Sequence, residues 1–177
     1  MAHRSKFEQE RILQERAELL ARITSPDIQD GEHLEVTIFT IGAERYAIDS
    51  VLVQEIVTLN NLMPLPCVPS HIAGIFNLRG KLFAAVDLRT LLGIPVEAEG
   101  NEKKVVVLHD NGMEFGLIAD EIEGVLSLPL SRVQDTLITQ QTNGGVYLRG
   151  VTCDRLVLLD GVQLIHDQNL IVHDEKC

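Results

Sequence analysis

The stretch IAGIFNLRGKLFAAVDLRTLLGIP, residues 72 to 95, decides the fold because two apolar runs meet at a tight turn within it. Residues 75–78 and 82–86 predict two strands that pair on either side of Arg79-Gly80, where glycine takes the positive φ that the turn needs. A turn between two buried strands must lie at the surface, because its backbone groups need water or other partners. We therefore expect the basic side chains of this turn to be exposed.

A short helix is predicted directly after the second of these strands. Asp87 has the side chain of a helix N-cap, whose carboxylate accepts hydrogen bonds from the free N–H groups of the first turn. Arg89 follows as an expected surface partner. Gly93 is favoured at the left-handed position that ends a helix. The buried side of the helix is then formed by Leu88, Leu91 and Leu92.

Three further hairpins are predicted along the chain. LEVTIFTI and YAID flank a turn at residues 42–45, and KVVVLHD and MEFGLIAD flank Asn111-Gly112. Asn-Gly is the dipeptide that most readily enters the left-handed region required by a two-residue hairpin turn. A third turn is expected near Cys153-Asp154. Many short strands with few helices favour a mainly β fold of sandwich or barrel lobes.

The composition excludes several classes of partner. The chain has 177 residues, with 26 acidic and 15 basic side chains and a formal net charge of -11. Nucleic acids and anionic lipid surfaces need a basic protein surface, so neither is expected as a partner. The apolar runs stop far short of the ~20 residues that span a bilayer, and the charged first residues do not form a signal peptide. We expect a cytoplasmic protein.

The cysteines do not predict a metal site or a disulfide framework. Cys67, Cys153 and Cys177 are odd in number, lie far apart and have no ligand spacing. Reduced thiols are the simpler interpretation. No other pattern predicts a cofactor.

The first part of the chain differs from the rest in the spacing of its apolar residues. Residues 5–23 predict an amphipathic helix, and residues 25–33 have the composition of a linker. Docking of this helix on its own domain and binding to a partner or a second helix remain equally open, because each uses an apolar stripe. Membrane adsorption is the weakest alternative, because the polar face mixes acids and bases. The stripe consists of Ile12, Leu13, Leu19, Leu20 and Ile23.

The hairpin sequence resembles the signature of the CheW-type coupling proteins of bacterial chemosensory arrays. The resemblance begins with GIFNLRGKLFAAVDLRTLLGIP and includes FTIGAERYAIDSVLVQEI, which is similar to the first hairpin of that family and its following VQEI helix. FGLIADEIEGVLSL and YLRGVTCDRLVLLDGVQLI resemble its later strands in the same order. The likeness covers residues 34–166, which we expect to form a CheW-like domain. The helical extension and linker at 1–33 and a tail at 167–177 lie outside it.

This resemblance implies a fold and a function. The family fold consists of two small five-stranded β-barrel lobes that share a core, with no catalytic activity and no cofactor. Its members bind the cytoplasmic tips of methyl-accepting chemotaxis proteins and the regulatory domain of a CheA-type histidine kinase. By position, the receptor-contact residues would be Val53, Glu55 and Arg79. The residues expected to maintain the motifs are Asn77, Leu78, Gly80, Asp87, Arg89 and Gly112.

Two other functions remain as alternatives. A CheW-like adaptor could serve another signalling system, such as surface motility. A small hydrolase could use His71 or the His-Asp dipeptides at 109–110, 166–167 and 173–174. This second alternative is weak, because the chain has no GxSxG, HExxH or Walker motif. In addition, a histidine and an aspartate that are adjacent in a strand point to opposite faces and do not face one another.

Overall fold

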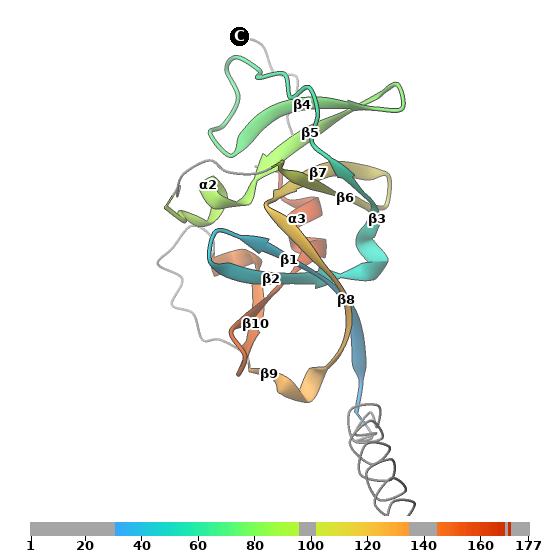
Figure 1. Cartoon of the computed structure of the whole chain (residues 1–177), viewed down its shortest axis with the longest axis vertical. Coiled ribbons are helices and arrows are strands. Elements are labelled where there is room, and N and C mark those ends of the chain that lie inside the picture. The colour runs from blue at the N-terminus through green and yellow to red at the C-terminus, as the bar shows by residue number, and fades with distance from the viewer. Residues whose placement is uncertain (1–30, 96–101, 135–144, 169, 171–177) are drawn as a thin grey trace, which may run out of the picture. The chain divides into compact units, whose positions relative to one another are not determined.

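A computed structural model of the chain describes residues 31–95, 102–134, 145–168 and 170 (Figure 1). The chain divides into two compact units, residues 1–31 and 32–177. The described elements belong to the second unit. The predicted N-terminal helix and its apolar stripe, as well as Cys177, lie outside the described residues.

The second unit consists of two β-sheets in which most strand pairs are antiparallel, and each sheet forms one lobe. This confirms the predicted mainly β fold of two lobes. Lobe A is a six-stranded sheet of order β8-β1-β2-β11-β10-β9, and lobe B is a five-stranded sheet of order β3-β6-β7-β5-β4. The sixth strand of lobe A, β9, has only two residues. The strands of lobe A are β1 (His33–Ile41), β2 (Glu44–Asp49), β8 (Glu121–Pro129), β9 (Val133–Gln134), β10 (Leu148–Thr152) and β11 (Leu156–Leu159). The strands of lobe B are β3 (Val53–Thr58), β4 (Ile72–Leu78), β5 (Lys81–Asp87), β6 (Lys104–Asp110) and β7 (Met113–Ala119).

Short helices connect or cover these strands. Two α-helices, α2 (Leu88–Leu92) and α3 (Gly161–His166), each follow a strand and begin at an aspartate N-cap. Three 3₁₀ turns, η1 (Ser50–Leu52), η2 (Leu130–Arg132) and η3 (Gly145–Tyr147), lie at strand ends. None of the helices within the described residues is long and apolar enough to cross a membrane.

Three clusters of buried side chains hold the lobes together. One lies within lobe A around Val36 and Leu158, and a second lies within lobe B around Phe76 and Val107. The largest combines residues of both sheets with α3. Its fully buried members include Phe39, Ile48, Val106, Leu108, Leu117 and Leu164. Burial of this apolar surface between the sheets is the main contribution that stabilises the association of the two lobes. The predicted shared core is therefore confirmed.

The local turn chemistry was predicted well. β4 and β5 pair in register about Arg79-Gly80, and β6 and β7 pair about Asn111-Gly112. β10 and β11 meet at a turn that begins at Cys153, as expected. The first hairpin turn is shorter than predicted, because Glu44 and Arg45 already pair with β1 and only residues 42–43 connect the strands.

The predicted VQEI helix was wrong. Residues 53–56 begin β3, which pairs antiparallel with β6. Only the preceding turn η1 is helical, with the Asp49 carboxylate accepting a hydrogen bond from the Val51 N–H. A short apolar segment carries too few residues to distinguish helix from strand by its period, so the tertiary pairing with β6 determines the outcome.

Two parallel strand pairs were not predicted. β11 pairs with β2 in lobe A, and β5 pairs with β7 in lobe B. Each joins segments far apart in the chain, which hairpin signals cannot reveal. They place α2 and α3 next to the shared core, where Leu88 and Leu164 are fully buried.

Candidate functional site

The β4–β5 turn presents Arg79 in an unusual backbone conformation. Arg79 has φ of 52° and Gly80 has φ of 87°, so both central residues of this two-residue turn are left-handed. This is the pattern of a type I′ turn, which matches the twist of the flanking strands. The Asn77 side-chain oxygen accepts a hydrogen bond from the Gly80 N–H at 2.9 Å and closes the turn. In this turn Asn77 therefore supplies the closing hydrogen bond, and Gly80 supplies a residue that tolerates the left-handed backbone.

The β6–β7 turn of the same lobe shows what such a turn ordinarily contains. Asn111 and Gly112 have φ of 47° and 84°, close to the values at Arg79 and Gly80. Asparagine tolerates the left-handed region better than arginine does. The backbone of the β4–β5 turn therefore gives no reason for an arginine at position 79.

The Arg79 side chain contacts Glu55, the second of the three predicted receptor-contact residues. Arg79 Nη2 lies 3.0 Å from Glu55 Oε2, and Nη1 lies 3.5 Å from Oε1. The arginine side chain is 79% exposed and the glutamate side chain 23%. The pairing orients the guanidinium while leaving most of its surface available. A surface pair of this kind adds only about 0–1 kcal/mol to folding stability.

Val53, the third predicted residue, lies at the start of β3. Its side chain is half-buried and packs against the shared core. Exposed Gln54 separates it from half-buried Glu55, and the pairing of β3 with β6 shifts register at this point. The structure thus places Val53 and Glu55 on one short strand, and of these two residues it is Glu55 that forms the ion pair with Arg79.

A second ion pair on the same hairpin was not predicted. Lys81 pairs with Glu114 of β7, and its ammonium group lies 5.2 Å from the centroid of the Phe83 ring. Glu114 gave no signal in the sequence, because its position beside Lys81 depends on the parallel contact of β5 with β7. Leu78, a predicted motif residue, is half-buried and packs on the lobe B core.

The sequence Asp-Leu-Arg at residues 87–89, which begins α2, joins the two lobes. The Asp87 carboxylate accepts a hydrogen bond from the Arg89 N–H at 2.9 Å, which confirms Asp87 as the N-cap of α2. The Arg89 side chain is only 11% exposed and pairs with Asp120. Asp120 also accepts a hydrogen bond at 2.7 Å from the Gly42 N–H in the β1–β2 turn. Arg89 was expected to be a partner at the surface; its side chain instead lies poorly exposed at the junction between the lobes.

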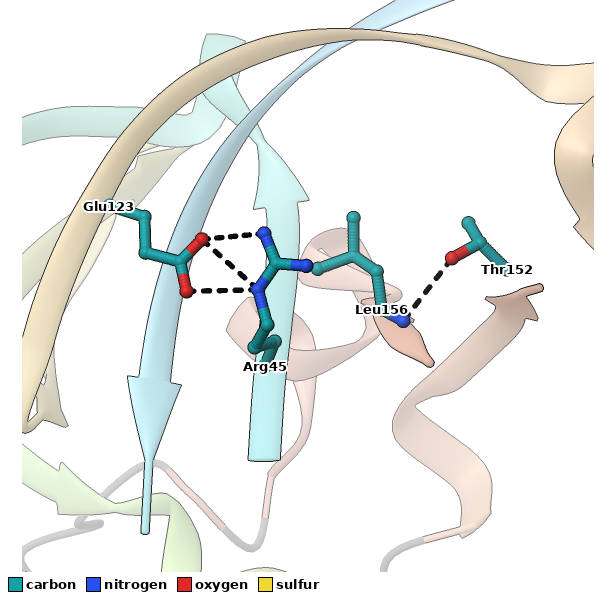
Figure 2. Close-up of polar contacts among 4 residues, drawn as sticks. All are labelled: Arg45, Glu123, Thr152 and Leu156. Carbon is teal, nitrogen blue, oxygen red and sulfur yellow. Dashed lines mark hydrogen bonds and ion pairs between the residues drawn. The ribbon is translucent and has the colours of Figure 1, made fainter. Parts of the chain in front are cut away.

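Lobe A carries another bidentate pair, shown in Figure 2. Arg45 of β2 donates from Nε to Glu123 Oε1 at 2.9 Å and from Nη2 to Oε2 at 2.5 Å. The hydrogen bond from Arg45 lowers the pKa of Glu123, and the hydrogen bond to Glu123 raises the pKa of Arg45. Thr152 closes the neighbouring turn by accepting a hydrogen bond from the Leu156 N–H at 3.2 Å.

Residues of two predicted His-Asp dipeptides meet in the structure. His166 of α3 lies 2.8 Å from Asp110 of the β6–β7 hairpin, so two of the predicted His-Asp dipeptides contribute one residue each to a pair. Among the contacts of the described residues, His166 has no serine hydroxyl or cysteine thiol beside it. The dipeptide at 173–174 lies outside the described part of the chain. A histidine and a carboxylate without a nucleophile do not form a hydrolytic triad.

The described residues also give no metal site. No group of three or more His, Cys, Asp or Glu side chains in that part of the chain could hold a metal ion. Cys67 and Cys153 are exposed free thiols. Of the three predicted contact residues, Arg79 and Glu55 form an ion pair and Val53 is a half-buried apolar side chain.

The chain is similar in sequence to known chemotaxis proteins. The CheW-like domain model matches residues 35–169. The chemotaxis protein CheW of Treponema pallidum is 28% identical over 152 residues, covering 82% of this chain and 89% of that protein. The corresponding protein of Bacillus subtilis is 28% identical over 150 residues, covering 85% and 92%.

A solved structure agrees with the fold. The scaffolding protein CheW from Thermoanaerobacter tengcongensis superimposes with a TM-score of 0.66 at 21% identity, over 82% of this chain and 97% of that one. This likeness establishes the fold alone. The domain match covers most of the chain and assigns the family: this chain belongs to the CheW-like family.

Proposed function

We propose that this chain is a non-catalytic adaptor of bacterial chemosensory signalling. It couples the cytoplasmic tip of a methyl-accepting chemotaxis protein to the regulatory domain of a CheA-type histidine kinase, in the cytoplasm. Membership of the CheW-like family supports the proposal, as do relatives named chemotaxis proteins and a structural neighbour described as a scaffolding protein. The adaptor works by surface complementarity and needs no cofactor.

One observation supports the β4–β5 turn as the receptor contact. Arg79 is held in a left-handed conformation, is 79% exposed and lies 3.0 Å from Glu55. A guanidinium offers five donors, so it can keep the bond to Glu55 and still donate to a carboxylate or to backbone carbonyls of a receptor helix. An exposed arginine that is already oriented loses less side-chain freedom on binding than a mobile one.

Two exposed apolar side chains close in sequence to the predicted contact residues would extend the proposed surface. Leu82, next to Lys81, is 55% exposed, and Val51, two residues before Val53, is 82% exposed. Exposed apolar residues beside charged ones are typical of surfaces that bind an amphipathic helix. The receptor helix would bury these residues while its polar groups pair with Arg79. The kinase regulatory domain binds a separate surface of the chain.

Calorimetric titration of receptor tip and kinase regulatory domain against three proteins tests this proposal. These are the wild type, Arg79→Asn and the control Arg155→Asn. Asparagine keeps the left-handed turn at position 79. Arg155 is a matched control, because it is also exposed and left-handed, with φ of 59°, but lies in lobe A.

We expect Arg79→Asn to weaken receptor binding by roughly 1 to 3 kcal/mol and to leave kinase binding nearly unchanged. Arg155→Asn should affect neither titration. Unchanged receptor affinity of Arg79→Asn would remove Arg79 from the contact. Failure of the wild type to bind either partner would favour the alternative of a CheW-like adaptor in another signalling system.

A further inference from the structure

A pocket opens at one end of lobe A. The two edge strands of the lobe A sheet, β8 and β9, are joined directly by the turn η2, so the sheet curls and its edges approach one another. Residues of β2, β8, η2 and the β10–β11 hairpin line the pocket, whose volume is about 180 Å³. Sites for drug-sized ligands have roughly 300–1,000 Å³, so this pocket suits a smaller ligand.

The floor of the pocket is apolar. Leu128 of β8 and Leu156 of β11 line it and belong to the buried cluster of lobe A, and each is 3% exposed. Leu126 also lines the pocket and is 45% exposed. An apolar group that enters the pocket would remove part of this leucine surface from water, which is favourable. The floor therefore favours a ligand with a short aliphatic part.

Two opposite charges line the same pocket without pairing. Arg132 ends η2, and Asp154 lies in the β10–β11 turn. Both residues are exposed, and in the described part of the chain neither forms an ion pair. Their charged groups are therefore more than 4.0 Å apart, although both belong to one small pocket. Each charge remains available to a ligand.

The third charged residue of the lining is already paired. Arg45 of β2 uses Nε and Nη2 to donate to the Glu123 carboxylate (Figure 2). The charge of Asp154 also acts on Arg45, but the two form no ion pair. Because the Arg45–Glu123 pair is neutral as a whole, Arg132 and Asp154 are the two charges that a ligand has to neutralise. A simple anion or a simple cation would satisfy only one of them.

We propose that this pocket binds a small zwitterion with an aliphatic side chain, which is the chemistry of a free aliphatic amino acid. Its carboxylate accepts hydrogen bonds from the Arg132 guanidinium, whose planar fork matches a carboxylate. Its ammonium group donates to the Asp154 carboxylate, and its side chain packs on Leu126 and the apolar floor. The inference goes beyond the proposed function and does not depend on it, because the pocket lies in lobe A and the Arg79–Glu55 pair in lobe B.

Ligands that each lack one feature test this assignment. Calorimetric titration of the full chain with leucine should show one binding site. Isocaproate is leucine without its ammonium group, isoamylamine is leucine without its carboxylate, and glycine is an amino acid without a side chain. Each should bind about tenfold more weakly than leucine or worse, because a hydrogen bond between charged groups or the burial of apolar surface is lost.

Two substitutions test the charges of the protein. Arg132→Gln and Asp154→Asn should each weaken leucine binding about tenfold or more. The loss should depend on the ligand group: Arg132→Gln should bind leucine and isoamylamine about equally, and Asp154→Asn should bind leucine and isocaproate about equally. Arg155→Asn is the control, because it makes the same charge change as Arg132→Gln in the turn that carries Asp154 but lies outside the pocket lining. It should bind leucine as the wild type does.

Several results would overturn the proposal. One is the absence of leucine binding by the wild type, and another is equal affinity of the wild type for leucine and for isocaproate or isoamylamine. Leucine affinity that neither Arg132→Gln nor Asp154→Asn changes would place the ligand elsewhere. An equal loss in Arg155→Asn would reflect net charge instead of contact. Circular dichroism checks the folding of each variant, and the wild-type titrations with the four ligands decide the question even where a variant does not fold.

Discussion

The Arg79 guanidinium lies 3.0 Å from the Glu55 carboxylate, although the two residues come from opposite edges of the lobe B sheet. Glu55 belongs to β3, the first strand in the sheet order, and Arg79 follows β4, the last. The sheet must therefore curl until its two edges approach one another at this point. This curl creates the surface on which the proposed receptor contact depends.

The Arg79–Glu55 pair is expected to contribute little to folding. A double-mutant cycle of Arg79→Asn and Glu55→Gln should give a coupling free energy below about 1 kcal/mol, since the arginine is largely exposed. Added salt should reduce the coupling further. Urea unfolding of the four proteins measures it. A coupling of several kcal/mol would mean that the pair is required for the fold and would leave its role in binding doubtful.

The hairpins of this protein could be predicted from sequence because turn chemistry is local. Asn111-Gly112 and Arg79-Gly80 each define a turn through the residues at the turn itself. Asp87 defines the start of α2 in the same way. Such signals need no knowledge of the rest of the chain.

The contacts that form the candidate site could not be predicted in this way. Glu55 and Arg79 are 24 residues apart, and Lys81 and Glu114 are 33 apart. Both contacts depend on strand order, which the sequence does not show. The helix predicted at residues 53–56 failed for the same reason, because its pairing with β6 is a long-range contact.

The junction between the lobes should be far more sensitive to mutation than the exposed pairs. Arg89→Ala leaves Asp120, which is 24% exposed, without its ion-pair partner. Removing one member of a poorly exposed charge pair should lower the free energy of unfolding by roughly 2 to 3 kcal/mol. Urea unfolding followed by circular dichroism measures the change.

A matched control for this prediction is Arg79→Asn. Its partner Glu55 is 23% exposed, much like Asp120, but the Arg79 side chain is 79% exposed, so we expect a loss below about 1 kcal/mol. Equal losses at Arg89 and Arg79 would show that burial at the lobe junction does not determine the effect.

Deletion of residues 1–31 should leave a folded protein. β1 begins at His33, which pairs with Pro129 of β8, so this deletion keeps every strand of both sheets. Cooperative urea unfolding should persist. A melting temperature lower by several degrees, which is on the order of 1 to 2 kcal/mol, would favour docking of the predicted helix on its own domain. An unchanged value would favour a role in binding a partner. Loss of folding would place the domain boundary elsewhere.

The two tyrosines should resist ionisation together. Burial, followed by a hydrogen bond from each hydroxyl to a carboxylate, raises the pKa of Tyr46 beside Glu44 and of Tyr147 beside Asp167 far above 10.0. In the unfolded chain both titrate near 10.0, so their contribution to stability is complete below that pH and is lost as the pH rises above it.

The chain has no tryptophan and no other tyrosine, so tyrosinate absorbance reports these two groups alone. We expect it to appear only together with unfolding. Tyr46→Phe and Tyr147→Phe should each halve the absorbance change, and tyrosinate that forms near pH 10.0 in the folded protein would contradict the raised pKa values.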